Sequence, residues 1–279
     1  MMMNLQQLAI DRFVRAIRTA YRQAFGHLER RYADVLGWVA RLALENIANC
    51  DALYHNVEHT IMVSLAGQSI LKGKQLVESG ITPRDWLHFM TATLCHDIGY
   101  TRGLCKQDRE GVYATGVNDE TVAIPPDGTD VALTPYHVDR SKLFVRERFG
   151  GNVLVDLDAK LIGDFIEMTR FPVPEGDFYR DTRGLGGLVR AADFIGQLGD
   201  PNYLRKIPAL YHEFAENGAL EKNGYASPGQ MRRQFGHFYW KVVRPYLEDA
   251  LVYLRITHEG KQWVANLHAH VFHVEHEDL

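Results

Sequence analysis

Residues suited to binding a metal ion occur in three separated segments of the chain. His55 and His59 stand four apart in the run YHNVEH, the pair His96-Asp97 follows downstream, and Asp193 lies in an otherwise apolar run. Neutral imidazole nitrogens and carboxylate oxygens together suit a divalent ion that keeps open positions for water or substrate. The sequence therefore predicts one metal site assembled from three helices.

The two histidines of the first segment are expected to have different tasks. Residues four apart share one face of a helix, so His55 and His59 can point into the same cavity. Hydrolysis of a phosphate ester requires a Lewis acid, an activated water and a proton donor for the leaving alkoxide. A neutral His59 held on a metal cannot donate that proton, whereas a cationic His55 just outside the metal shell can. The two oxygens of Asp97 allow it to bridge two metals ~4 Å apart.

These motifs resemble those of the HD-domain metal-dependent phosphohydrolases, and more closely those of class I cyclic-nucleotide phosphodiesterases. The run YHNVEH is similar to the YHNxxH motif of that family. Further similar segments follow in the family's order, and the resemblance covers roughly residues 51–251. The run YHVDRS at 136–141 is similar to the family's YNDRS motif, with one extra residue. Ala191-Ala192-Asp193 is similar to the segment that holds the family's last metal ligand. Phe238 stands seven residues before Pro245, as the family's base-stacking Phe stands before its Pro.

The resemblance implies a divalent-metal-dependent phosphodiesterase that acts on a cyclic or small nucleotide. A water bridging two metals would attack phosphorus, and His55 would protonate the leaving oxygen as the general acid. The implied cofactor is one or two divalent ions, such as Zn, Mg, Mn or Fe, and the implied partner is a small phosphorylated substrate. The implied metal ligands are His59, His96, Asp97 and Asp193, and the implied substrate-binding residues are Phe238 and Gln234.

Two positions depart from the family pattern. Tyr100 stands where the family's HDxxH motif has its second His. At the distance before Pro245 where the family has the Gln that reads the purine edge, this chain has Phe235, and Gln234 is one position away. Other activities therefore stay open: a phosphomonoesterase or nucleotide phosphohydrolase on the same site, a non-catalytic metal- and nucleotide-binding module, and a di-iron oxygenase. Asp164 is the alternative to Asp193 as the last ligand. Arg140 is expected to be mainly structural.

The elements that must position these residues are predicted to be helices. Apolar residues recur at three and four residues, and no segment alternates as a strand does, so we expect an all-α fold. We divide it into an N-terminal helical extension, residues 1–50, and an HD-type domain, residues 51–279. The predicted helices span 5–49 with a break at Gly26, 57–72, 83–99, 134–149, 156–168, 182–198, 201–217, 228–256 with a kink at Pro245, and 260–276.

The remaining features of the sequence concern the loop at 101–133, the possible partners and the location of the protein in the cell. Residues 101–133, rich in glycine, proline and acids, are expected to form a mobile flap over the cleft. A net charge of -4 over 279 residues gives no support for nucleic acid as a partner. The odd number of cysteines, three, and the lack of a membrane-spanning run favour a cytoplasmic protein with reduced thiols. An arginine-rich face near the N-terminus is interpreted as solvated or as a homodimer seam, and the histidines at 268–276 as incidental.

Overall fold

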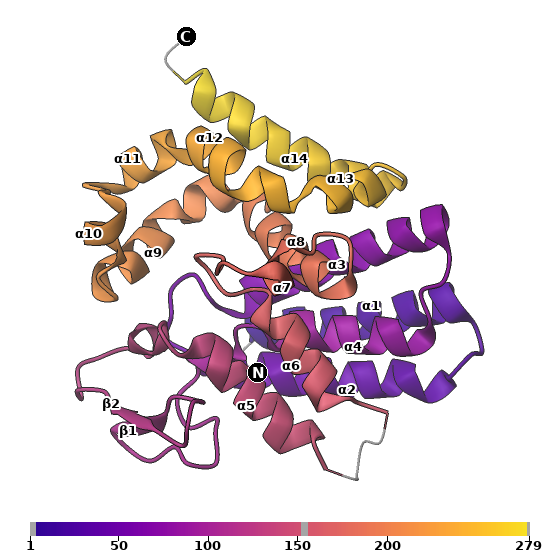
Figure 1. Cartoon of the computed structure of the whole chain (residues 1–279), viewed down its shortest axis with the longest axis horizontal. Helices are drawn as coiled ribbons and strands as arrows, with labels where there is room; N and C mark the ends of the chain where they lie inside the picture. The colour runs from indigo at the N-terminus through magenta and orange to yellow at the C-terminus, as the bar shows by residue number, and fades with distance from the viewer. Residues whose placement is uncertain (1–3, 152–155, 278–279) are drawn as a thin grey trace.

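A computed structural model describes residues 4–151 and 156–277 and consists almost entirely of helices (Figure 1). This confirms the all-α prediction. The main helices are α1 (Leu5–Phe25), α2 (Arg30–Ile47), α3 (Val57–Glu78), α4 (Pro83–Cys95), α5 (His137–Phe149), α6 (Ala159–Glu167), α8 (Leu185–Leu198), α9 (Tyr203–Glu216) and α14 (His258–Glu275). Shorter ones are α7 (Asp177–Arg180), α10 (Ala219–Asn223), α11 (Pro228–Arg233), α12 (Phe235–Phe238) and α13 (Glu248–Leu254).

Helix starts follow the capping residues of the sequence. The side chain of Thr82 accepts from the Asp85 N–H, and the Asp85 carboxylate accepts in return from the Thr82 N–H, which fixes the start of α4. Asn56 caps α3 in a related way. The expected break at Gly26 is also present, between α1 and α2. Local sequence signals thus set the helices that carry the site.

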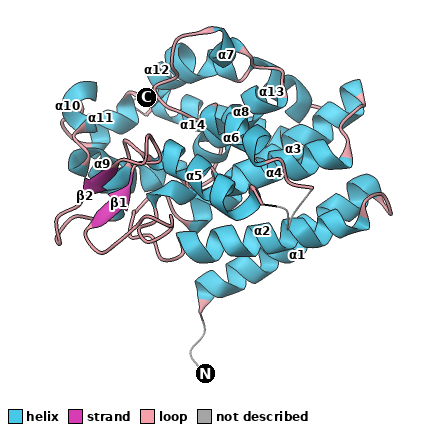
Figure 2. Cartoon of the chain, turned by 60° about the horizontal axis from the view of Figure 1, so that its bottom comes forward, coloured by secondary structure: helices cyan, strands magenta, loops and turns pink. Residues whose placement is uncertain are grey.

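Helices α1 and α2 share the hydrophobic core of the rest of the chain. They lie side by side along one edge of the molecule, next to α4 (Figure 2). Phe25 at the end of α1 packs edge-on against the buried Trp86 of α4, with ring centroids 5.6 Å apart. Ile17 and Leu36 are fully buried in the same core. Residues 4–50 therefore pack as part of the main body.

The centre of the fold is the packing of α8 against α3. A Cβ on Gly196 of α8 would lie 2.4 Å from the Cα of Val63, so only glycine allows this approach. The neighbouring Ala192 is fully buried. This close contact brings the Asp193 turn of α8 next to the first turn of α3, which carries His59.

The segment 101–133 is a packed element rather than the expected unpacked flap. Strands β1 (Val112–Ala114) and β2 (Thr121–Ala123) form a small antiparallel hairpin, and a 3₁₀ turn, η2, spans Asp130–Leu133. Leu104, Cys105 and Ala114 are buried. The strands are only three residues long, which is why no alternating pattern identified them.

The predicted helix over 228–256 is wrong as a single element. It is divided into α11, α12, a π-helical turn η3 (Tyr239–Val243), a 3₁₀ turn η4 (Arg244–Tyr246) and α13. Pro245 lacks the N–H that a continuous helix needs, and the Arg244 N–H donates to the Tyr239 carbonyl five residues back. The break is therefore larger than the kink we expected. Among the described residues, no helix is long and apolar enough to cross a membrane.

Candidate metal centre

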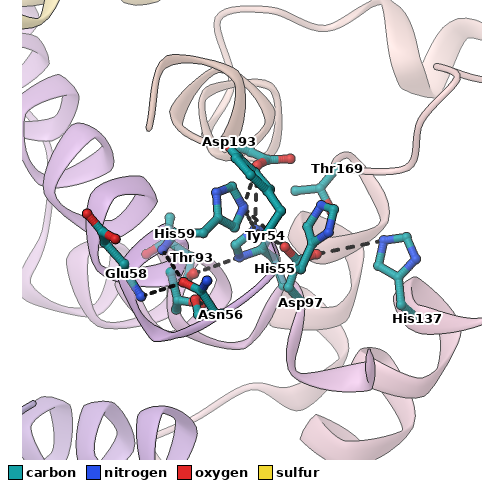
Figure 3. Close-up of polar contacts among 12 residues, drawn as sticks. Tyr54, His55, Asn56, Glu58, His59, Thr93, Asp97, His137, Thr169 and Asp193 are labelled. Carbon is teal, nitrogen blue, oxygen red and sulfur yellow. Dashed lines mark hydrogen bonds and ion pairs between the residues drawn. The ribbon is translucent and has the colours of Figure 1, made fainter. Parts of the chain in front are cut away.

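Four of the predicted ligands converge on one point, between the first turn of α3, the end of α4 and the middle of α8 (Figure 3). Nε2 of His59 lies 3.2 Å from Oδ2 of Asp97 and 3.5 Å from Oδ1 of Asp193. Nε2 of His96 lies 3.1 Å and 3.5 Å from the same two oxygens. The two Nε2 atoms are 3.4 Å apart. His59, His96 and Asp193 thus lie close enough to share one ion, and so do His55, His59 and Asp97.

These separations fit ligands of a single ion. Two atoms each ~2.1 Å from one ion are about 3.0 Å apart at a right angle and about 3.4 Å apart at a tetrahedral angle. The five distances among His59, His96, Asp97 and Asp193 lie between 3.1 and 3.5 Å. Two imidazoles and two carboxylates are a donor set for Zn²⁺, Mn²⁺ or Fe²⁺. The residues present therefore fit a divalent metal.

Local structure fixes the orientation of the His96 imidazole. The Nδ1 atom of His96 lies 2.9 Å from the Thr93 carbonyl, which accepts a hydrogen bond from Nδ1–H, so that in the neutral ring Nε2 carries the free lone pair. The Ser141 hydroxyl donates to the His96 carbonyl and accepts from the Gly99 N–H. A Cβ on Gly99 would lie 2.0 Å from the His137 carbonyl, so glycine is required where α5 crosses this turn. The end of α4 is thereby locked in place.

The electrostatics of the cluster call for a cation. Burial disfavours the charged imidazole of His96, but the charges of Asp97 and Asp193 outweigh it and raise its pKa well above the usual range. Burial also opposes charge on Asp193, yet the neighbouring His96 lowers the pKa of this carboxyl to about 2. The buried Asp97 and the half-buried Asp193 thus stay anionic at neutral pH. A divalent ion at this point would supply positive charge in place of the imidazole protons and would keep both imidazoles neutral.

His55 stands beside the cluster and is held by a buried acid. Its Nδ1 lies 2.5 Å from Oε2 of Glu213 on α9, and Oε1 of Glu213 accepts from the backbone N–H groups of Tyr54 and His55. Burial disfavours the imidazolium, but the charge and hydrogen bond of Glu213 outweigh it and raise the pKa of His55 to about 9. His55 is therefore cationic at neutral pH, as a proton donor must be.

His137 at the start of α5 is a ligand candidate that the sequence interpretation missed. Its Nδ1 lies 2.6 Å from the Thr134 carbonyl, so this nitrogen carries the proton. Burial lowers the pKa of His137, which keeps the ring neutral. Its bare Nε2 then faces Oδ1 of Asp97 at 3.7 Å (Figure 3). Two lone pairs facing each other favour a cation between them, on the opposite side of Asp97 from the four-residue cluster.

Tyr100 links His55 to His137. Its ring stacks on His55 with centroids 4.7 Å apart and on His137 with centroids 4.6 Å apart. Tyr100, the position at which the sequence departs from the HDxxH pattern that it resembles, thus separates the two imidazoles. Neither Tyr100 nor Glu213 had a sequence signal, since their roles depend on contacts between distant segments.

Comparison of the whole sequence with protein-family models gives a match over residues 3–277. The chain belongs to the Npun_R2479-like family. A comparison with curated proteins found no match. The family description names no activity, so the chemistry of this Npun_R2479-like chain is argued from its site.

Arg140 and Asp164, two further residues considered in the sequence, both lie outside the cluster of candidate ligands in this Npun_R2479-like protein. Arg140 is fully buried and donates to both oxygens of Asp108 and to the carbonyls of Gly99, Thr101 and Ala114. This agrees with its expected structural role, because it ties the hairpin segment to the turn after Asp97. Asp164 pairs with Lys160 on the surface and lies outside the cluster, which favours Asp193 as the ligand.

The two predicted substrate-binding residues, Phe238 and Gln234, are not among the candidate metal ligands. The half-buried Phe238 packs edge-on against Phe171, with centroids 6.0 Å apart, and Phe171 contacts Phe194, the neighbour of Asp193 in the chain. Gln234 is exposed, and no hydrogen bond holds its side chain among the described residues. Phe238 thus belongs to an aromatic patch that leads to Asp193, whereas Gln234 faces solvent.

Proposed function

We propose that the protein is a divalent-metal-dependent phosphohydrolase, and that it cleaves a phosphodiester of a cyclic or small nucleotide. The observation that carries this proposal is the position of His55. A cationic imidazole, oriented by Glu213, stands beside four metal ligands without being needed as one of them. A site that only bound a metal would have no use for such a proton donor.

In this proposal the chain's own residues divide the work. His59, His96, Asp97 and Asp193 would hold the ion, which supplies Lewis acidity and lowers the pKa of bound water. Glu213 keeps the Nδ1 proton of His55 in place, so that Nε2 carries the proton that is donated. Transfer from Nε2 to the leaving oxygen would leave His55 neutral, ready to take up another proton. The burial of His59 and His96 keeps bulk water from competing for the ligand positions.

A second ion would be held by Oδ1 of Asp97 and Nε2 of His137. Its role would be to bind a phosphate oxygen of the substrate opposite the first ion. The same histidine favours a second candidate function, a di-iron oxygenase, because His137 adds a nitrogen ligand that the sequence interpretation lacked. The two candidates differ in metal and in reaction: only the oxygenase requires iron and consumes oxygen.

The proposal is tested by a turnover screen with a matched pair of variants. The purified protein, loaded in turn with Zn, Mg, Mn or Fe, is assayed on cyclic nucleotides, on bis(4-nitrophenyl) phosphate and on 4-nitrophenyl phosphate. We expect metal-dependent release of product that is lost in His59→Ala and kept in His273→Ala, whose imidazole is exposed on α14. Hydrolysis of none of these esters with any metal would overturn the proposal, and so would activity that survives His59→Ala.

A further inference from the structure

A polar hollow lies away from the metal ligands, on the outer side of the N-terminal helix. It is an open groove of about 440 Å³ between α1 and α3. None of the candidate metal ligands lines it. Its polar lining comes mainly from two helices: Arg12, Arg15, Thr19 and Gln23 of α1, and Gln68 and Lys72 of α3.

The four arginines of α1 fall into two groups. Arg18 and Arg22 both lie close to the Asp34 carboxylate of α2, at 3.8 and 3.5 Å. Arg12 and Arg15, in contrast, form no ion pair and no side-chain hydrogen bond with any residue in 4–151 or 156–277. Both are exposed and both line the groove. The two arginines without an ion pair are therefore the same two that line the groove.

The acids closest to this groove are already engaged. Glu259, which also lines it, accepts from the Lys72 ammonium at 2.8 Å. Asp11, next to Arg12 in the chain, pairs with Arg41 at 2.7 Å. These pairs leave Arg12 and Arg15 without a direct ion pair among the residues that the structure describes. The groove therefore carries a local positive charge on a protein whose net charge is -4.

We propose that this groove binds a phosphate-bearing anion. Guanidinium groups match the geometry of phosphate oxygens and bind them through paired N–H donors. Arg12 and Arg15 are three residues apart on one helix, so both can reach one ligand. The side-chain amides of Gln23 and Gln68 add neutral donors along the lining.

The test uses two single variants, each of which replaces one arginine of α1 by a glutamate and so reverses its charge. Inorganic pyrophosphate is titrated calorimetrically into the full chain after divalent ions are stripped with a chelator, so that the metal centre gives no signal. We expect Arg15→Glu to weaken binding at least 10-fold and Arg22→Glu to change it less than 2-fold. Circular dichroism confirms that both variants are folded.

The source of the phosphate is distinguished by a second arm, sedimentation with phosphatidylcholine vesicles that contain or lack phosphatidic acid. Binding of pyrophosphate with the variant pattern above assigns the groove to a soluble phosphate ligand. Binding of phosphatidic acid vesicles alone, again lost in Arg15→Glu, assigns it to a lipid headgroup. No binding in either arm, or equal losses in Arg15→Glu and Arg22→Glu, would overturn the inference. Since stripped protein is used, neither result depends on the proposed hydrolase activity.

Discussion

Two regions of this protein are rich in histidine, and they differ in every property that matters for metal binding. At the metal centre, His59 and His96 come from different helices, are buried, and face the carboxylates of Asp97 and Asp193. The second region is the four histidines at 268–276, in the second half of α14 and directly after it, and each of them contacts a different neighbour. His268 contacts the Tyr239 hydroxyl, His270 the Leu198 carbonyl, His273 the Glu277 carboxylate and His276 the Phe272 carbonyl.

The comparison teaches that convergence, and not density of histidine, predicts a site. Ligands on one helix face different directions unless they are three or four residues apart, whereas ligands from three helices can surround a point. Among the described residues, the groups able to share an ion contain His55, His59, His96, Asp97 and Asp193 and none of α14. The following predictions test this contrast.

The largest effect is expected from removal of a ligand. His96→Ala should lose both the bound ion and all measurable turnover, because it removes one of four donors and leaves Asp97 and Asp193 without the nitrogen between them. Metal stoichiometry by mass spectrometry and turnover are measured on the same sample. Retention of a full equivalent of metal in a folded His96→Ala protein would contradict the assignment of the cluster.

Much of this centre could be predicted because its residues sit at local sequence signals. Asn56 and Thr82 cap the helices that carry His59 and His96, and apolar periodicity placed α8 around Asp193. Glu213 and His137 could not be predicted, since each acts on a residue far away in the chain. The breaks in 228–256 were missed because they lie in the backbone hydrogen bonds of the π turn and at Pro245, which the spacing of apolar side chains does not report.

The next effect concerns the proton donor. His55→Ala should keep the metal, since His59, His96, Asp97 and Asp193 remain, and should lower turnover by ~10²–10⁴. The loss should be smaller on a nitrophenyl ester, whose leaving group needs little protonation. The measurement is metal content and rate on one good and one poor leaving group. Equal losses on both substrates, or loss of metal, would place His55 among the ligands.

Glu213 offers a finer test through pH. Its carboxylate raises the pKa of His55 to about 9 against the effect of burial, so the protonated donor persists until the pH passes that value. In Glu213→Gln the pKa should fall towards the ordinary value of ~6.5, and at pH 8 turnover should drop about 30-fold while activity below pH 6 is kept. A pH–rate profile is the measurement. If the fall of the rate at high pH were unchanged in Glu213→Gln, Glu213 would not control the protonation of His55.

A smaller effect is expected from His137, which tests the second ion. His137→Ala should retain the ion held by His59 and His96 and lose the one beside Oδ1 of Asp97, so the stoichiometry should fall from two to one. His137→Gln, which keeps a polar side chain without the imidazole, should do the same. Two equivalents of metal in His137→Ala would remove this residue from the centre.

The smallest effect is expected on α14. His270→Ala removes a hydrogen bond to the Leu198 carbonyl and should lower stability by ~1 kcal/mol, with metal content and turnover unchanged. Thermal unfolding and metal analysis check both parts. A fall in metal content would show that the C-terminal helix shares in metal binding after all.

The central claim, that one ion joins α3, α4 and α8, is tested most directly by anomalous X-ray diffraction from crystals of the purified protein. Data collected above and below the absorption edge of the bound metal identify the element and its position. The account predicts a peak ~2.0–2.3 Å from Nε2 of His59, Nε2 of His96 and one oxygen each of Asp97 and Asp193. A peak on α14 instead, or none at this point in crystals grown with the metal, would contradict it.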